Sequence, residues 1–307
     1  MKKYKIIFGL LVLILVLSAC NSNENEGFSF EEVKNNQIDH IHGLGYINGE
    51  SDVVIATHFG LYKYAKDGWK EANSQKHDYM GFQAVREGFF SSGHPEEGSE
   101  YKNPLGLIKS IDKGASFEQL AFYGEIDFHY LTAGYDSNTI YVLNEMPVEE
   151  MNAGLHYSTD EGSSWTKAAM NGFTSDYISN LSAHPTRKEL LTIGSKDGIF
   201  ISNDHGQNFK SMNDTKMVTY VTLTETGGYY SNLENDTVYL KFFLFESDEE
   251  INIQLPKELK MDPITFIAVN PENQQEIVIV TNSNNIYITK DEGLSWDQIA
   301  SNGELAK

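Results

Sequence analysis

Short apolar runs of strand length recur along the chain between turn residues. Runs at residues 53–55 and 277–280 are rich in Val and Ile, which favours β-strands. Five segments open with Asp directly before an apolar stretch: Asp39, Asp78, Asp127, Asp176 and Asp262. Further along, Gly or Asn precedes an apolar residue at residues 60–62, 106–108, 154–156, 198–200 and 285–287. We therefore expect repeats of four short strands, which we call a, b, c and d.

A turn motif follows the third strand in four of these repeats. Residues 110–117 (SIDKGASF), 158–165 (STDEGSSW), 202–209 (SNDHGQNF) and 289–296 (TKDEGLSW) share Ser or Thr, Asp, Gly and a closing aromatic residue at fixed offsets. We predict hairpin turns in which the Asp side chains accept hydrogen bonds from backbone N–H groups and Gly supplies a positive φ. The four residues are Asp112, Asp160, Asp204 and Asp291. The motif resembles the Asp-box, or BNR repeat, of sialidase-like and sortilin-like β-propellers.

The spacing of this motif gives the number of blades. Its copies start at residues 110, 158, 202 and 289, and the last gap is twice the usual one, so a degenerate copy is expected near residues 246–248. Another degenerate copy lies at residues 64–69. Six repeats of roughly 44 residues have the length of four-stranded blades. We predict an all-β fold, a six-bladed β-propeller of four-stranded antiparallel blades with Asp-box hairpins, over residues 38–307. The ring is expected to close without an exchanged strand, and residues 28–33 could add a strand to an edge.

The start of the chain predicts export. Lysines precede an apolar run at residues 6–17, which is too short to span a bilayer comfortably. Small residues directly before Cys20 resemble the lipobox of bacterial lipoproteins, which implies that residues 1–19 are a signal peptide and that Cys20 is acylated. Residues 20–37 are polar and acidic and are expected to form a tether. We expect a body on the extracytoplasmic face of the cell membrane, anchored by lipid.

Charge excludes several functions. Lys+Arg is 23 against 44 for Asp+Glu, a formal net charge of −21, so nucleic acid is excluded as a partner. Arg86 and Arg187 are the only arginines in the sequence. Sialidases bind the substrate carboxylate with three arginines, so sialidase activity is excluded as well.

Six of the nine histidines fall at strand-a starts or strand-b ends of blades 1 to 3: His40, His42, His58, His77, His94 and His129. In a propeller these positions face one mouth of the central channel, where ligands normally bind. His156, His184 and His205 occupy positions expected to be structural. Imidazoles beside carboxylates suit Zn²⁺ or copper, and Met80 is a candidate soft ligand. We expect a metal-binding module in which His58, His94 and His129 contact the ion, with His40 or His42 completing the set and Glu145 nearby.

Two other functions would use the same mouth. A glycoside hydrolase needs two carboxylates, and Glu125 and Glu145 are the candidates because they depart from the repeat, whereas the strand-opening Asp residues resemble turn caps. An imidazole such as His94 or His129 could instead act as acid or base. A metal-free assembly factor would bind a protein partner there.

Residues 40–45, 56–61, 80–82, 92–95 and 125–129 resemble segments of exported bacterial BNR propellers described as glycosyl-hydrolase-like. That resemblance implies no particular mechanism. Sortilin-like and photosystem-assembly-factor propellers share the motif and bind proteins. Binding and catalysis, and a glycan or a protein as ligand, therefore stay open at this point.

Overall fold

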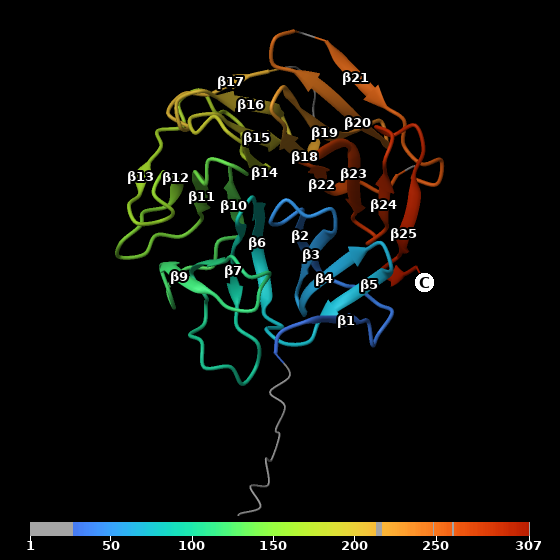
Figure 1. Cartoon of the computed structure of the whole chain (residues 1–307). Helices are drawn as coiled ribbons and strands as arrows, with labels where there is room; N and C mark the ends of the chain where they lie inside the picture. The colour runs from blue at the N-terminus through green and yellow to red at the C-terminus, as the bar shows by residue number, and fades with distance from the viewer. Residues whose placement is uncertain (1–26, 213–216, 248, 260, 307) are drawn as a thin grey trace, which may run out of the picture.

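The computed structural model describes residues 27–212, 217–247, 249–259 and 261–306, and it consists of six antiparallel sheets around a central axis (Figure 1). Every regular secondary-structure element in this part of the chain is a β-strand. The prediction of an all-β, six-bladed propeller is confirmed. The predicted signal peptide, Cys20 and residues 21–26 of the predicted tether lie outside the described residues. No helix in the described ranges is long and apolar enough to cross a bilayer.

The strands follow one another within each blade. Blade 1 contains β2 (Ile41–Gly45), β3 (Val53–Thr57), β4 (Gly60–Ala65) and β5 (Gly68–Ala72). Blade 2 contains β6 (Asp78–Val85), β7 (Gly88–His94), β8 (Leu107–Ser110) and β9 (Glu118–Ala121). Blade 3 contains β10 (Tyr130–Ala133), β11 (Ile140–Asn144), β12 (Gly154–Ser158) and β13 (Thr166–Lys167). Blade 4 contains β14 (Ile178–Ala183), β15 (Leu191–Ser195), β16 (Gly198–Ser202) and β17 (Lys210–Ser211).

The last two blades have longer strands. Blade 5 contains β18 (Val218–Leu223), β19 (Gly227–Glu234), β20 (Thr237–Leu244) and β21 (Glu250–Ile253). Blade 6 contains β22 (Ile264–Asn270), β23 (Asn273–Thr281), β24 (Ile286–Thr289) and β25 (Asp297–Ser301). The expected degenerate motif near residues 246–248 falls between β20 and β21, although its Asp248 is not among the described residues. The first strand of each blade lies closest to the axis (Figure 1).

The two ends of the described chain meet. β1 (Phe30–Glu32) pairs with β5 and widens blade 1, and β26 (Glu304–Leu305) pairs with β25 and widens blade 6. The N–H of Ile38 donates to the carbonyl of Gly303 at 2.8 Å, and the N–H of Leu305 donates to the carbonyl of Asn36 at 2.9 Å. No strand of the described ring is exchanged between blades 1 and 6, as predicted. The ordered fold therefore begins before residue 38.

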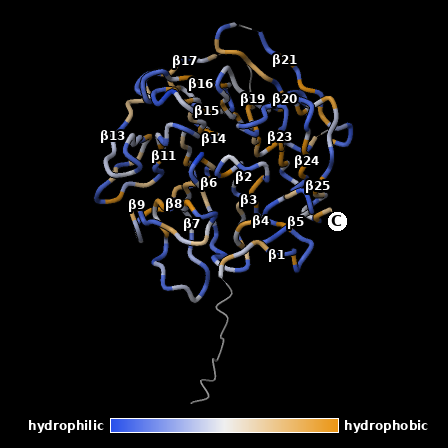
Figure 2. The backbone as a smooth tube through the Cα atoms, in the orientation of Figure 1, coloured by the Kyte–Doolittle hydropathy of each residue, from blue (hydrophilic) through white to orange (hydrophobic). Residues whose placement is uncertain are grey.

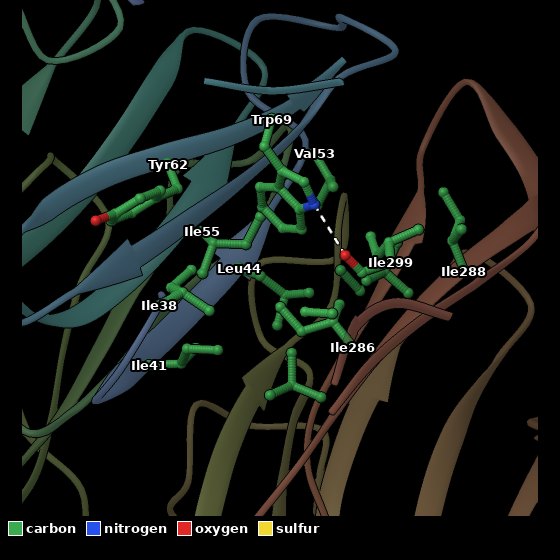
Figure 3. Close-up of a cluster of buried hydrophobic side chains, with 14 of the residues drawn as sticks. Ile38, Ile41, Leu44, Val53, Ile55, Tyr62, Trp69, Ile286, Ile288 and Ile299 are labelled. Carbon is green, nitrogen blue, oxygen red and sulfur yellow. Dashed lines mark hydrogen bonds between the residues drawn. The ribbon is translucent and has the colours of Figure 1, made fainter. Parts of the chain in front are cut away.

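Apolar side chains fill the spaces between blades. Hydrophobic positions follow the strands, while hydrophilic positions dominate the outer connections (Figure 2). One cluster joins blade 1 to blade 6 and includes Ile55, Trp69, Ile286 and Ile299 (Figure 3). Because the cluster combines residues more than 200 positions apart, its burial links the two ends of the ring.

The four predicted hairpin turns share one hydrogen-bond pattern. In the first, Asp112 Oδ1 accepts from the N–H of Ser116 at 2.9 Å, and Ser110 Oγ accepts from the N–H of Gly114 at 2.8 Å. The equivalent bonds are present around Asp160, Asp204 and Asp291. Hydrogen bonds from the hydroxyl and N–H of Ser164 lower the pKa of Asp160, because they stabilise the ionised carboxylate.

Candidate functional site

Two imidazoles of blade 1 converge on the first residue of blade 2. His58 Nδ1 lies 2.8 Å from Asp78 Oδ2, and His42 Nε2 lies 3.3 Å from Asp78 Oδ1. One ligand atom from each of the three side chains lies within 4.8 Å of the other two. Two ligands of one Zn²⁺ ion lie at most about 4.4 Å apart, because Zn²⁺–ligand bonds are about 2.0–2.2 Å long, so small movements of these side chains would let all three contact one ion. We call these three residues the His42 cluster.

The backbone explains this convergence. β2 pairs with β3 through Ile41 and then through Gly43, so His42 sits at a register shift, where a bulge re-aims a side chain. His58 directly follows β3, and its N–H donates to the carbonyl of His40 at 3.1 Å. His40 has a positive φ of 48°, and its ring centroid lies 5.7 Å from that of His58.

Two polar atoms of the His42 cluster are buried without a hydrogen bond. His42 Nε2 and Asp78 Oδ1 have no hydrogen-bond partner among the described residues, because their 3.3 Å approach is not aligned for one. The Asp78 side chain is only 12% exposed. Leaving such atoms unsatisfied costs about 1–3 kcal/mol each, and a bound cation would satisfy both.

Electrostatics favours the metal-binding form of His42. Burial lowers the pKa of His42, and the positive charges that His58 and His40 would carry act in the same direction, whereas Asp78 opposes them. The imidazole is therefore neutral at pH 7, which is the form that coordinates metal ions.

A similar arrangement recurs between blades 2 and 3. His129 Nε2 lies 2.7 Å from Asp127 Oδ2, and His94 Nε2 lies 3.3 Å from the same oxygen. His129 Nδ1 lies 3.8 Å from Glu145 Oε2. Asp127 Oδ1 is buried without a hydrogen-bond partner in the described part of the chain. His94 and Asp127 hold the repeat positions of His58 and Asp78. We call His94, Asp127, His129 and Glu145 the His129 cluster.

The predicted ligands thus fall into two clusters. His42 and His58 belong to the first, His94 and His129 to the second, and His40 lies beside Asp39 with 3.5 Å between Nε2 and Oδ2. Sequence reasoning assigned Asp78 and Asp127 to turn caps and missed that each faces the imidazole ending strand b of the preceding blade. The repeat register contained this information, because it places the Asp that opens one blade next to the histidine at the end of strand b in the preceding blade.

His77 does not face the channel mouth, so that prediction is wrong. Its ring is buried, with centroids 5.3–5.7 Å from those of Tyr79, Tyr101 and Phe117. Its Nδ1 accepts from the N–H of Glu96 at 2.8 Å, and Nε2 pairs with Gln75 Oε1 at 2.9 Å. Both ring nitrogens are therefore used by the fold.

The remaining candidates are dispersed. Met80 lines a cavity of about 220 Å³ in the central channel together with His42 and His129. Glu125 is exposed. His156 and His184 are buried and His205 stacks on Tyr157 with 4.5 Å between ring centroids, as expected for structural positions.

Comparisons with known proteins establish the fold. No protein-family model matches the sequence, and no curated protein is significantly similar to it. The structure resembles the GH74 enzyme of Niastella koreensis, with a TM-score of 0.56 and 16% identity over 89% of this chain and 47% of that one. The GH74 xyloglucanase of Xanthomonas campestris has a TM-score of 0.54 and 14% identity over 89% of this chain and 47% of that one. YCF48 bound to D1 peptide has a TM-score of 0.50 and 12% identity over 90% of this chain and 85% of that one.

This chain spans about half the length of the two GH74 proteins. At such low identity the likeness shows a shared fold, and functions differ widely among proteins that share one.

Proposed function

We propose that this chain is a metal-binding module in which His42, His58 and Asp78 hold a Zn²⁺ or copper ion at one mouth of the propeller channel. The observation that carries the proposal is the pair of buried atoms without hydrogen bonds, His42 Nε2 and Asp78 Oδ1, inside a compact three-residue cluster. A cation bound between them would remove both unsatisfied groups.

The donor set supports Zn²⁺ or copper over harder cations. Imidazole nitrogens suit Zn²⁺ and copper, whereas Mg²⁺ and Ca²⁺ prefer oxygen ligands. Three protein ligands would leave a coordination position open for water or a ligand. The neighbouring His129 cluster would add further polar side chains beside the ion. In that cluster, Asp127 orients the His129 ring through a 2.7 Å contact.

We further propose that the module is anchored outside the cell membrane by lipid on Cys20 and belongs to the Asp-box, or BNR-repeat, propellers. The support for the anchor is the leader and the small residues before Cys20 in the sequence. The support for the Asp-box assignment is the hydrogen-bond pattern that recurs around Asp112, Asp160, Asp204 and Asp291.

Elemental analysis tests the metal. The full chain would be purified in detergent without chelator, loaded with Zn²⁺ or Cu²⁺ and dialysed, beside the His42→Ala/His58→Ala double variant. We expect about one equivalent of metal in the parent chain and loss of it in the variant. Equal metal content in both, or none in either, would overturn the assignment.

Protein binding at the same face is a second candidate. Large apolar side chains are exposed in connections that open on the face of the His42 cluster: Phe59, Met146, Tyr177, Met217 and Met261. Such side chains mark interaction surfaces when they gather on one face. YCF48, which shares this fold, is described in complex with a peptide. Capture from solubilised membranes with the parent chain and a Phe59→Ser/Met146→Ser variant would identify a partner that depends on this rim.

Glycoside hydrolysis has less geometric support. Glu145 contacts His129, and Glu125 is exposed, so no observed contact links the two carboxylates to a shared site. The likeness to GH74 enzymes extends to the fold alone.

A further inference from the structure

Sulfur ligands distinguish the two metals that suit the His42 cluster. Zn²⁺ and copper both bind imidazole, but Zn²⁺ also accepts carboxylate oxygen, whereas a thioether sulfur favours Cu⁺. Cys20 is the only cysteine in the sequence and lies outside the described residues. A sulfur ligand from the described part of the propeller can therefore come only from methionine.

Seven of the eight methionines lie in the described ranges, and Met80 differs from the other six. Those six either pack with the apolar clusters between blades or are exposed in connections: Met151, Met170, Met212, Met146, Met217 and Met261. Met80 instead lines the cavity of about 220 Å³ in the central channel that His42 also lines. Among the described methionines, Met80 is thus the one candidate for a ligand beside His42.

The backbone brings Met80 next to His42. A Cβ atom placed on Gly43 of β2 would lie 3.0 Å from the Cβ atom of Phe82 in β6, so the two strands pack closely where blades 1 and 2 meet. His42 directly precedes Gly43, and Met80 lies two residues before Phe82. Both side chains reach the same cavity from these adjoining strands.

Met80 also shares a face of its strand with Asp78. Residues 78–80 pair in regular register with residues 92–94 of β7, and successive side chains of a strand point to opposite faces. Asp78 and Met80 are both partly exposed, whereas Tyr79 between them is buried. The carboxylate and the thioether are therefore consecutive side chains on one face of β6.

Either of these two side chains can complete a site with the imidazoles. A methionine side chain is unbranched and has three rotatable bonds, so its sulfur can move within the cavity while the strand stays in place. His58 Nδ1 lies 2.8 Å from Asp78 Oδ2, so Asp78 can bind an ion directly or hold His58 in position for one.

We propose that the His42 cluster selects Cu⁺ and that Met80 determines this selectivity. Cu⁺ is held by the sulfur of Met80 and by the imidazoles of His42 and His58, while Asp78 orients His58. Zn²⁺ uses the carboxylate of Asp78 in place of the sulfur. This inference rests on the metal site proposed above and names the ion that the site selects.

Affinities of the Met80→Leu variant test the proposal, because Leu keeps an apolar side chain of similar size and removes the sulfur. The full chain in detergent is titrated with Cu⁺ under nitrogen in competition with a chromogenic Cu⁺ chelator, and with Zn²⁺ by calorimetry. In the parent chain, Cu⁺ should displace bound Zn²⁺. Met80→Leu should weaken Cu⁺ binding at least about tenfold, because even residues that only orient metal ligands contribute about 10–100-fold to affinity. Its Zn²⁺ affinity should not change.

Met146→Leu is the matched control. Met146 is 75% exposed in the connection that follows β11, so its replacement should leave the affinity for both ions unchanged. X-ray absorption of the Cu⁺-loaded chain should show a sulfur neighbour of copper in the parent and in Met146→Leu, and none in Met80→Leu.

The outcomes separate this inference from the metal site on which it rests. Zn²⁺ binding that depends on His42 and His58, with unchanged Cu⁺ affinity in Met80→Leu, would overturn the selectivity and leave the metal site in place. An equal loss of affinity for both ions in Met80→Leu would show a structural role for Met80 and would overturn the selectivity as well. Binding of neither ion by the parent chain would overturn both proposals.

Discussion

The indole Nε1 of Trp69 donates a hydrogen bond of 2.9 Å to the carbonyl oxygen of Ile299 (Figure 3). Trp69 lies in the last strand of the four-stranded part of blade 1, and Ile299 lies in β25 of blade 6. The bond therefore joins two segments 230 residues apart in the sequence. Together with the backbone bond from Ile38 to Gly303, it closes the ring without a shared strand.

Replacing Trp69 with Phe should weaken this closure. The substitution keeps an aromatic ring but removes one of two donors to the carbonyl of Ile299, which also accepts from the N–H of Ala306 at 3.0 Å. Loss of one intramolecular hydrogen bond costs about 0.5–1.5 kcal/mol. We expect the free energy of unfolding to fall by that amount, measured by urea denaturation followed by circular dichroism.

Trp296→Phe is the matched control. Trp296 Nε1 also donates to a carbonyl, that of Gln254 at 2.7 Å, but at an exposed position where water can replace the donor. An equal loss in both variants would argue against a special role of Trp69 in closure.

The sequence was sufficient for the blade count because four of the six blades carry the turn motif at a regular spacing. The recurrence of Asp and Gly around Asp112 and Asp291 fixed the period, and one period is one four-stranded sheet. The repeat register also correctly aligned His58 with His94. These inferences needed only local chemistry and spacing.

The composition of the clusters could not be predicted in the same way. Asp78 meets His42 because a bulge in β2 re-aims one imidazole and because blade 2 packs beside blade 1. His77 directly precedes the first strand of blade 2, where the repeat predicts side chains that face the channel mouth. Its ring is instead surrounded by aromatic side chains.

Asp78→Asn should weaken metal binding without unfolding the chain. The amide removes the negative charge between His42 and His58 while keeping the side-chain shape. We expect at least a tenfold weaker affinity for Zn²⁺ by calorimetry, about 1.4 kcal/mol or more.

Asp262→Asn provides the control for that variant. Asp262 has the same place in blade 6, but it accepts from the N–H of Ser283 at 3.0 Å and from Asn285 Nδ2 at 2.9 Å instead of facing imidazoles. Its replacement should leave Zn²⁺ affinity unchanged. Parallel losses in both variants would show a structural effect.

Asp204→Ala should destabilise its hairpin turn. Asp204 Oδ1 accepts from the N–H of Asn208 at 2.9 Å and from Ser202 Oγ at 2.8 Å. Loss of an equivalent side-chain cap typically costs about 1 kcal/mol, which urea denaturation would detect. Asp176→Ala, whose side chain is 82% exposed and pairs with Lys196, should change stability by less than about 0.5 kcal/mol. A similar change in both would mean that the motif does not stabilise the turn.

Acid should destabilise the fold through buried imidazoles, and His77 is the clearest case. Burial lowers the pKa of His77, although Glu96 opposes the shift. Below the ordinary His pKa of about 6.5, the unfolded chain therefore binds more protons than the folded chain, and the free energy of unfolding falls as the pH decreases. Protonation would also break the bond from the N–H of Glu96 to Nδ1. We expect urea denaturation at pH 7.5, 6.0 and 5.0 to show this fall.

His77→Asn separates this contribution from those of the other histidines. The variant should be less stable than the parent at pH 7.5 and should lose less stability between pH 7.5 and 5.0, because the group that titrates is gone. His40→Asn, at an exposed position, should leave the pH dependence as it is in the parent. If His77→Asn and the parent lose the same free energy of unfolding over this range, the buried His77 ring does not contribute to acid sensitivity.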